Sequence, residues 1–291
     1  MEKFTIGWEE WAALPKLGLP AIWAKCKVIK IDQKINSPVV LSIAGSDSSG
    51  GAGIQADIKS ITVQGGYAAT AITAITAQNT LGVQSIHIIP DQEIIAQINS
   101  VKDDLEIAAV KTGMLTSPKI IDYIASVFKD AILVVDPVMV ATSGDVLVED
   151  SVIAAIQSIL LPVATLATPN LQEAEILTGI KINNTKDQIN AGERIIETGC
   201  KAALIKGGHG DGGAISDVLV HEGMYIFEHE KIDTKNTHGT GCTLASSIAT
   251  NLALGVSLQD ACKESIDYVA TLLKSSPSLG KGNGPLMHNL F

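Results

Sequence analysis

The chain has 291 residues, of which 46% are hydrophobic and 18% are charged, and its formal net charge is −10 at pH 7. An acidic surface of this kind argues against a protein that binds nucleic acid or anionic membranes, although a small phosphate site made of backbone amides stays compatible with it. The four cysteines show no CxxC spacing, no apolar run reaches the ~18 residues of a membrane span and no signal peptide opens the chain, so we expect a cytoplasmic protein with reduced thiols.

The first 36 residues differ in composition from the rest of the chain. They contain all three tryptophans, whereas Ala, Ile, Val and Gly dominate after "NSP". We therefore place a boundary near Ser37–Pro38. Residues 1–36 are expected to be an appended segment of unknown role, and residues 37–291 are expected to form the functional domain.

Apolar runs of strand length alternate with segments of helical period from Val39 onward. Strands are predicted over 39–45, 67–77, 83–89, 107–114, 131–138, 164–170 and 202–209, followed by a hairpin over 215–230 that turns at Glu222–Gly223. Helices are predicted over 53–66, 91–104, 117–128, 242–255 and 257–276, and a further helix is predicted to start at Asn170-x-x-Glu173. This alternation favours an α/β fold in which a mainly parallel sheet is covered by helices on both faces. Ligands of such folds bind at the carboxyl ends of the strands, so the residues there are the candidates for a site.

The glycine-rich stretch "GSDSSGGAGIQAD" begins where the first predicted strand ends. It contains the G-x-G-x-x-A pattern of a dinucleotide site, but the acidic residue that should follow ~20 residues later is missing, which disfavours a nicotinamide or flavin cofactor. Two interpretations remain open: a structural turn, or a loop that closes over a polar small molecule. Asp47 and Asp57 favour the second, because two carboxylates exceed what a turn requires.

Polar side chains follow several of the other predicted strands. The Gln78 amide can donate and accept hydrogen bonds in one plane, which suits a heteroaromatic base with a ring nitrogen and an amino group, although it could equally be a satisfied amide at a strand end. Asp136 and Glu173 could form a magnesium site that relies on water and substrate phosphates, or they could cap helices. Lys206 could contact a nucleotide phosphate or be a solvated lysine.

The segment Gly239-Thr240-Gly241 leads into a predicted helix that begins near Cys242. The first N–H groups of a helix lack partners, and the helix dipole adds positive charge, so this segment predicts an anion hole for charge that develops during a reaction. The alternative is a glycine turn capped by Thr240. A P-loop and a nucleophile elbow are excluded because their motifs are absent, and a zinc site at His238 and Cys242 finds no further ligands.

Taken together, these motifs resemble one known family. The segments "AGSDSSGGAGIQADIKSI", "TAITAQNTLGVQSI", "VKTGML", "VVDPVMVATSGD", "TPNLQEAEILTG", "IKGGH", "DTKNTHGTGCTLASSIA" and "GKGNGPLMH" occur in the order and spacing of the hydroxymethylpyrimidine/phosphomethylpyrimidine kinases of thiamine biosynthesis, within the ribokinase-like superfamily. The resemblance extends from about Pro38 to the C-terminus. It implies a three-layer α/β/α fold, ATP and Mg²⁺, a small pyrimidine substrate and a homodimer.

The resemblance also implies roles for individual residues. Gln78 would bind the pyrimidine nitrogen edge, with Gly45, Asp57 and Met114 around it. The residues that would act on the phosphates and the metal are Asp136 and Glu173 for Mg²⁺, Lys206 and Lys235 for phosphate charge, and Gly239, Thr240 and Gly241 for the transferring phosphoryl group.

Cys242 differs from what a resemblance to the wider superfamily would imply. Most sugar kinases of that superfamily have an Asp at the matching position, where it acts as the base. We expect Cys242 to orient the substrate hydroxyl group and to accept its proton late in the transfer. Two other functions stay open: a pyridoxal kinase of the same fold, and a non-catalytic ligand-binding protein. The presence of Asp136, Glu173 and the GTG segment argues against the second.

Overall fold

The structure is a computed structural model, and it describes residues 37–139, 148–207, 214–276 and 278–290. The predicted segment 1–36 lies outside the described residues. In the part of the chain that is described, no helix has the length and apolar character of a membrane span.

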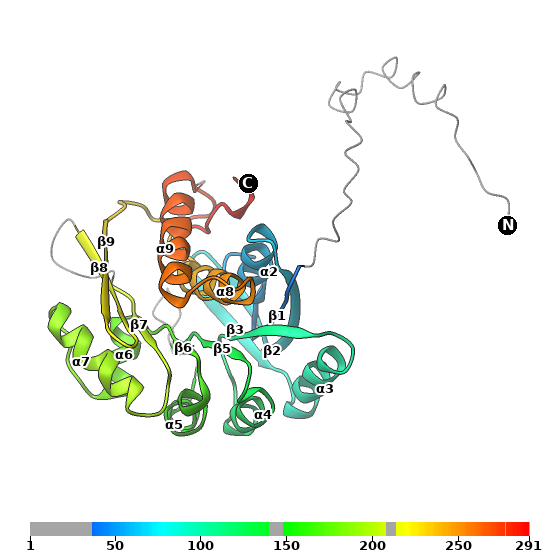
Figure 1. Cartoon of the computed structure of the whole chain (residues 1–291). Helices are drawn as coiled ribbons and strands as arrows, with labels where there is room; N and C mark the ends of the chain where they lie inside the picture. The colour runs from blue at the N-terminus through cyan, green and yellow to red at the C-terminus, as the bar shows by residue number, and fades with distance from the viewer. Residues whose placement is uncertain (1–36, 140–147, 208–213, 277, 291) are drawn as a thin grey trace, which may run out of the picture. The chain divides into compact units, whose positions relative to one another are not determined.

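A single sheet of nine strands runs through the described residues, in the order β3-β2-β1-β4-β5-β6-β7-β8-β9 (Figure 1). The strands are β1 (Val39–Asp47), β2 (Tyr67–Asn79), β3 (Gly82–Ile88), β4 (Ile107–Thr112), β5 (Ile132–Val135), β6 (Leu166–Ala167), β7 (Ala203–Ile205), β8 (Ala214–Val220) and β9 (Met224–Glu230). The six strands from β2 to β7 in this order pair in parallel, whereas β3, β8 and β9 pair antiparallel with their neighbours. The prediction of a mainly parallel sheet is confirmed.

Helices cover both faces of this sheet. They are α2 (Gly53–Val63), α3 (Asp91–Lys102), α4 (Pro118–Phe128), α5 (Asp150–Ala155), α6 (Leu171–Thr178), α7 (Thr185–Ile196), α8 (Thr240–Ala253) and α9 (Leu258–Ser275). Helix α4 begins as predicted, because the Ser117 side chain accepts a hydrogen bond from the Ile120 N–H and Pro118 occupies the first turn. Helices α5 and α7 are additions to the predicted set.

The alternation of side chains along the central strands separates two hydrophobic cores. Leu41 and Val110 point to the face that α3 to α7 cover, whereas Val40 and Ala109 point to the face that α2, α8 and α9 cover (Figure 1). All four side chains are fully buried. The molecule therefore has the three layers, α/β/α, that the resemblance implies.

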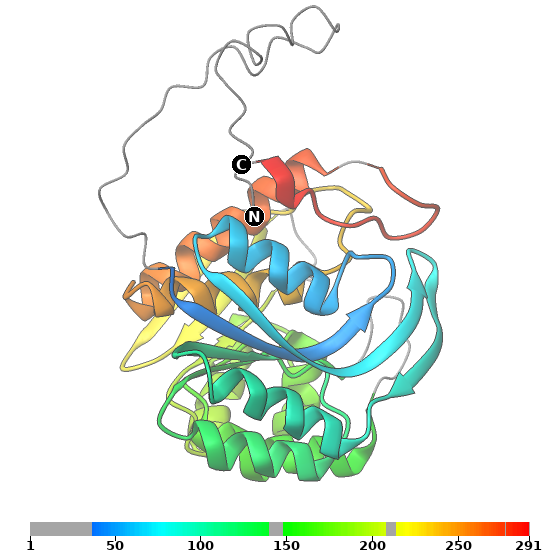
Figure 2. The same cartoon turned by 90° about the vertical axis from the view of Figure 1, so that its right-hand side faces the viewer.

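The C-terminal segment ties together two parts of the domain that are far apart in sequence. Gly282 donates a backbone hydrogen bond to the Thr80 hydroxyl group at the turn between β2 and β3, at 3.2 Å. Gly284 donates to the Lys235 carbonyl group and accepts from the His238 N–H, just before α8. Figure 2 shows this segment, in red, beside the β2–β3 hairpin, in cyan. The same segment therefore holds the end of β2 and the entry to α8.

His288 closes this segment in a buried position. Its Nε2 lies 2.8 Å from the Thr243 hydroxyl oxygen in the first turn of α8. Burial, together with the nearby Lys59 charge, lowers the His288 pKa from 6.5 to about 4. In the pH window between these two values the unfolded chain binds the proton and the folded chain does not, so stability falls as the pH falls from 6.5 to about 4.

We predict that His288 accounts for a loss of up to about 3 kcal/mol of unfolding free energy in that window. Urea unfolding of the wild type and of His288→Gln at about pH 7 and about pH 4.5 measures it. The variant should lose less stability on acidification than the wild type. Equal losses in the two proteins would contradict the assignment.

Candidate functional site

A cleft of about 740 Å³ opens at the carboxyl ends of the parallel strands. Ten of the predicted site residues line it: Gly45, Gln78, Met114, Asp136, Glu173, Lys206, Gly239, Thr240, Gly241 and Cys242. Because they lie at the carboxyl ends of β1, β2, β4, β5 and β7 or at the starts of α6 and α8, the fold itself brings them together.

The entry to α8 forms one wall of the cleft. The helix begins at Thr240, two residues before the predicted start, and Gly239 precedes it in the left-handed region with φ of +84°. Thr240 is therefore the first helical residue and does not cap the helix from outside; its hydroxyl group bonds to the Thr237 carbonyl group. In this first turn the Thr240 N–H donates to the Thr237 carbonyl group, which leaves the N–H groups of Gly241 and Cys242, both cleft-lining residues, for an anion hole.

A lysine and a carboxylate lie directly beside this turn. Lys206 Nζ is 3.1 Å from Asp136 Oδ1, and the lysine side chain is only 14% exposed, so it is not a solvated lysine. A Cβ atom built on Gly241 would stand 3.3 Å from Lys206 Nζ and 3.6 Å from Asp136 Oδ2. Burial lowers the Lys206 pKa, but the charges of Asp136 and Glu173 outweigh it and raise the value.

Glu173 caps a helix, which is one of the two roles that the sequence left open, and it also lines the cleft. Its Oε2 accepts a hydrogen bond from the Asn170 N–H at 2.8 Å, and the Asn170 Oδ1 accepts one from the Glu173 N–H, which is a capping box at the start of α6. The same carboxylate lines the cleft. Burial raises its pKa to about 7, with the Asp136 charge adding to the rise and Lys206 opposing it.

Asp136 and Glu173 fit a magnesium ion better than a zinc ion. Asp136 Oδ2 is buried and has no hydrogen-bond partner among the described residues, so it has an oxygen available for a cation. The described residues contain no group of three or more His, Cys, Asp or Glu side chains placed to hold a metal. Two carboxylates that leave the remaining positions to water and phosphate are the usual magnesium arrangement.

Cys242 faces the cleft from the first turn of α8 and is partly exposed. Burial raises its pKa to about 12; the Lys111 charge and a hydrogen bond from the Gly53 N–H oppose this rise, and Asp57 and Asp136 add to it. A pKa this far above neutral favours the protonated thiol at pH 7, which argues against the expected role of Cys242 as a proton acceptor and leaves the role of orienting the substrate hydroxyl group.

Asp57 requires a correction, because it does not line the cleft. Its side chain is fully buried in α2 and forms an ion pair with Lys111, whose Nζ lies 3.0 Å from each carboxylate oxygen. Ser42 and Ser246 also donate hydrogen bonds to this carboxylate. The Asp57 carboxylate is therefore neutralised by Lys111 inside the protein. Its ion pair and hydrogen bonds connect α2 to β4, β1 and α8.

Three of the residues that were predicted to surround the substrate, Gly45, Gln78 and Met114, do line the cleft. A Cβ atom on Gly45 would lie 3.4 Å from Met114 Sδ, so these two residues form adjacent parts of one wall. Gln78 lines the same cleft, and its Oε1 accepts a hydrogen bond from the Thr76 hydroxyl group. Lys235 differs from its predicted place: its side chain is exposed and it is not among the residues that line the cleft.

Sequence reasoning missed two polar pairs in the cleft wall. Asp47 Oδ2 lies 2.8 Å from His238 Nε2, and Asp217 Oδ2 lies 3.0 Å from His229 Nε2. The two residues of each pair come from different segments of the chain, and no sequence motif contains both of them. The Asp47 loop is nonetheless the turn that the first interpretation of the glycine-rich stretch describes.

Comparisons with known proteins agree on one family. The family model described as phosphomethylpyrimidine kinase matches residues 47–287. A hydroxymethylpyrimidine/phosphomethylpyrimidine kinase of Streptomyces coelicolor is 42% identical over 256 residues, which is 87% of this chain and 95% of that protein. The match therefore spans nearly the whole of the relative.

Two solved structures extend the comparison to the fold. The phosphomethylpyrimidine kinase of Clostridium difficile has a TM-score of 0.71 and 42% identity, covering 81% of this chain and 99% of that one. The pyridoxal kinase of Bacillus subtilis, solved as an ADP complex, has a TM-score of 0.79 and 34% identity, covering 87% and 97%.

Proposed function

Because the chain belongs to the phosphomethylpyrimidine kinase family, we propose that it uses ATP to phosphorylate 4-amino-5-hydroxymethyl-2-methylpyrimidine to the monophosphate and then to the diphosphate, in thiamine biosynthesis. One observation carries the proposal: the first turn of α8, Lys206 and Asp136 converge within a few ångströms of Gly241 in the cleft. That arrangement suits a phosphoryl group in transfer, because its charge is spread over several oxygens and needs several donors.

In the first step the hydroxymethyl oxygen attacks the terminal phosphorus of ATP, a new O–P bond forms, the bond to ADP breaks, and the alcohol proton passes late to an oxygen of the transferred phosphoryl group. The N–H groups of Gly241 and Cys242 bind the oxygens of the transferring group, and Lys206 adds a point charge on the same side. Gln78 and Met114 hold the pyrimidine ring so that its alcohol faces this turn. Most of the rate enhancement then comes from position and charge neutralisation.

Mg²⁺ would be held through water by Asp136 and Glu173 and would neutralise phosphate charge when bound. Asp136 also keeps Lys206 in the cleft through their ion pair. Glu173 holds the start of α6 through its capping box, so its carboxylate is fixed in place.

Incubation of the purified protein with the pyrimidine alcohol, ATP and Mg²⁺ tests the proposal, with the products separated by chromatography. We expect the monophosphate to appear first and the diphosphate to follow. Lys206→Ala should lose most of the transfer, since it removes the cation beside the anion hole. Accumulation of the monophosphate alone would refute the second step, and no transfer to the alcohol would refute the function.

Pyridoxal is the alternative substrate, because a pyridoxal kinase is among the solved structures with a high TM-score. The higher identity to the pyrimidine kinases favours the pyrimidine, as does the planar amide of Gln78. A side-by-side assay with both alcohols separates the two. A larger kcat/KM for pyridoxal would reverse the assignment.

We further propose a homodimer and a cytoplasmic location. Strand β3 ends the sheet, and Ile75, Leu81 and Ile88 on the β2–β3 hairpin are 50%, 63% and 56% exposed. Apolar residues at an unpaired sheet edge support association with a second copy. Light scattering after gel filtration measures the molar mass, and a monomer at micromolar concentration would contradict the dimer.

A further inference from the structure

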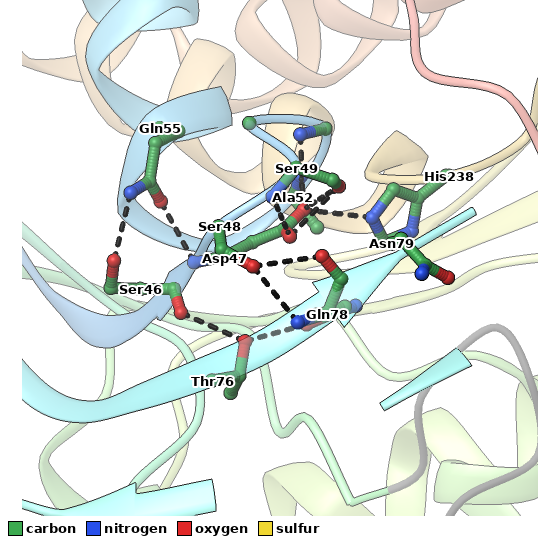
Figure 3. Close-up of polar contacts among 12 residues, drawn as sticks. Ser46, Asp47, Ser48, Ser49, Ala52, Gln55, Thr76, Gln78, Asn79 and His238 are labelled. Atoms are coloured by element: carbon green, nitrogen blue, oxygen red, sulfur yellow. Dashed lines mark hydrogen bonds and ion pairs between the residues drawn. The ribbon is translucent and has the colours of Figure 1, made fainter. Parts of the chain in front are cut away.

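The Asp47 carboxylate organises the whole loop between β1 and α2. Its Oδ1 accepts a hydrogen bond from the Ser49 N–H at 2.8 Å. Its Oδ2 accepts from the N–H groups of Gly51 and Ala52 at 3.0 and 2.8 Å, and the Ser49 hydroxyl group reaches both oxygens (Figure 3). Burial raises the Asp47 pKa, and the hydrogen bonds from His238, Ala52 and Ser49 outweigh this effect and lower it.

His238 links this loop to the anion hole. Its Nε2 lies 2.8 Å from Asp47 Oδ2, and both residues are almost completely buried, at 5% and 2% exposure. His238 immediately precedes Gly239, whose backbone is packed so closely on the Asp47 loop that a Cβ there would stand 1.9 Å from the Gly51 carbonyl oxygen. A shift of the Asp47 loop would therefore displace the first turn of α8.

The other side of the loop is bonded to the strand that carries Gln78. The Ser48 hydroxyl group donates to the Gln78 carbonyl oxygen at 2.8 Å and accepts from the Gln78 N–H at 2.9 Å. The Thr76 hydroxyl group donates to the Ser46 carbonyl oxygen at 2.9 Å. Figure 3 shows the bonds of Ser48 with Gln78 and those of Asp47 with His238 as two groups, which the backbone joins because Asp47 and Ser48 are adjacent in the chain.

We propose that Asp47 is a positioning residue that, through His238 and the loop amides, holds the pyrimidine-binding edge at Gln78 in register with the anion hole at residues 239–242. The inference rests on the proposed function of the cleft. Asp47 does not contact the reacting atoms in this account; it fixes the separation between the alcohol and the phosphoryl group. Phosphoryl transfer depends strongly on that separation, since a misplacement of about 1 Å can cost about 10²-fold in rate.

The negative charge of Asp47 is essential to this role. Every group around the two oxygens is a donor: three backbone N–H groups, the Ser49 hydroxyl group and the His238 ring nitrogen. An asparagine at this position would turn an NH₂ group toward N–H donors whichever way its amide were rotated. The loop would then have to open on one side, toward Ser49 or toward His238.

Steady-state kinetics of Asp47→Asn with the pyrimidine alcohol and ATP test the proposal. We expect kcat to fall about 10²-fold while KM for ATP stays within about threefold, because Asp47 pairs with His238 and not with Lys206, which is paired with Asp136 beside the phosphate position. Asn184→Ala is the control, since it removes the N-cap of α7 away from the cleft and lowers stability without a predicted effect on kcat. An Asp47→Asn enzyme with wild-type kcat overturns the proposal. So does an Asp47→Asn enzyme whose kcat falls no further than that of Asn184→Ala when the two variants have the same melting temperature.

Two His238 variants keep the proposal testable if Asp47→Asn fails to fold. In His238→Gln the side-chain amide can still donate to Asp47, so most of kcat should be retained; in His238→Ala it should fall as in Asp47→Asn. Equal kcat values for His238→Gln and His238→Ala overturn the proposal. If the proposed function is wrong, the wild type will transfer no phosphate to the pyrimidine alcohol. If only the positioning role is wrong, the ratio of variant kcat to wild-type kcat will show it. That ratio is measured with whichever alcohol the wild type phosphorylates.

Discussion

Replacement of Gly239 by alanine is expected to lower kcat by about 10²–10³-fold, the usual cost of losing one preorganised donor of an anion hole. Gly239 has φ of +84°, and its Cβ would stand 1.9 Å from the Gly51 carbonyl oxygen, which is backbone and cannot rotate away. Either residues 239–241 or the loop at Gly51 must move, and both contribute to the cleft. The measurement is kcat with the pyrimidine alcohol, together with the melting temperature.

Gly179→Ala is the matched control for this variant. Gly179 also has a left-handed φ, of +74°, at the end of α6, but no atom lies within 4 Å of its Cβ position. The backbone strain of alanine, about 1–2 kcal/mol, is therefore shared by the two variants, and the steric clash is confined to Gly239→Ala. If both variants kept the same kcat, the geometry of residues 239–241 would not be essential for transfer.

Cys242→Ala is expected to lower kcat by about 10²-fold and to leave KM for the pyrimidine nearly unchanged. General bases contribute about 10²–10⁴-fold when their pKa is close to the working pH. Burial raises the Cys242 pKa to about 12, so the thiol is already protonated and can orient the alcohol but cannot accept its proton, which places the effect at the low end of that range.

The serine variant tests the orienting role of Cys242. Cys242→Ser keeps a small group that can donate and accept hydrogen bonds, so its kcat should lie between those of the wild type and Cys242→Ala. An unchanged kcat in Cys242→Ala would remove this residue from the chemistry. The reaction would then depend on position and charge neutralisation alone.

The sequence predicts most of the fold because its strands are buried and its alternation is regular. The hairpin that turns at Glu222–Gly223 is present, with Glu222 at φ of 45°. Helices α5 and α7 are absent from the prediction. The α5 helix is only six residues long and runs into a π-helical turn, so its period is hard to recognise, and α7 begins at an Asn184 cap inside a polar stretch.

The sequence predicts the cleft residues that follow a strand, because parallel topology alone brings strand ends together. It does not predict which charges are neutralised inside the protein. Asp57 lies in the same glycine-rich stretch as Asp47, yet one forms a buried ion pair with Lys111 and the other holds a loop. Only the partner distinguishes them, and Lys111 and His238 are distant in sequence. Lys235 shows the opposite error, since being near the anion hole along the chain does not place its side chain in the cleft.

The C-terminal segment contacts Thr80 and the loop before α8, so the order of synthesis decides when these contacts can form. Domains begin to fold from the N-terminus while translation is still in progress. The strands of the sheet and the helices from α2 to α9 are synthesised before Gly282 and Gly284, which bind both sides of the cleft. A nascent chain therefore acquires its fold before it acquires its finished catalytic geometry.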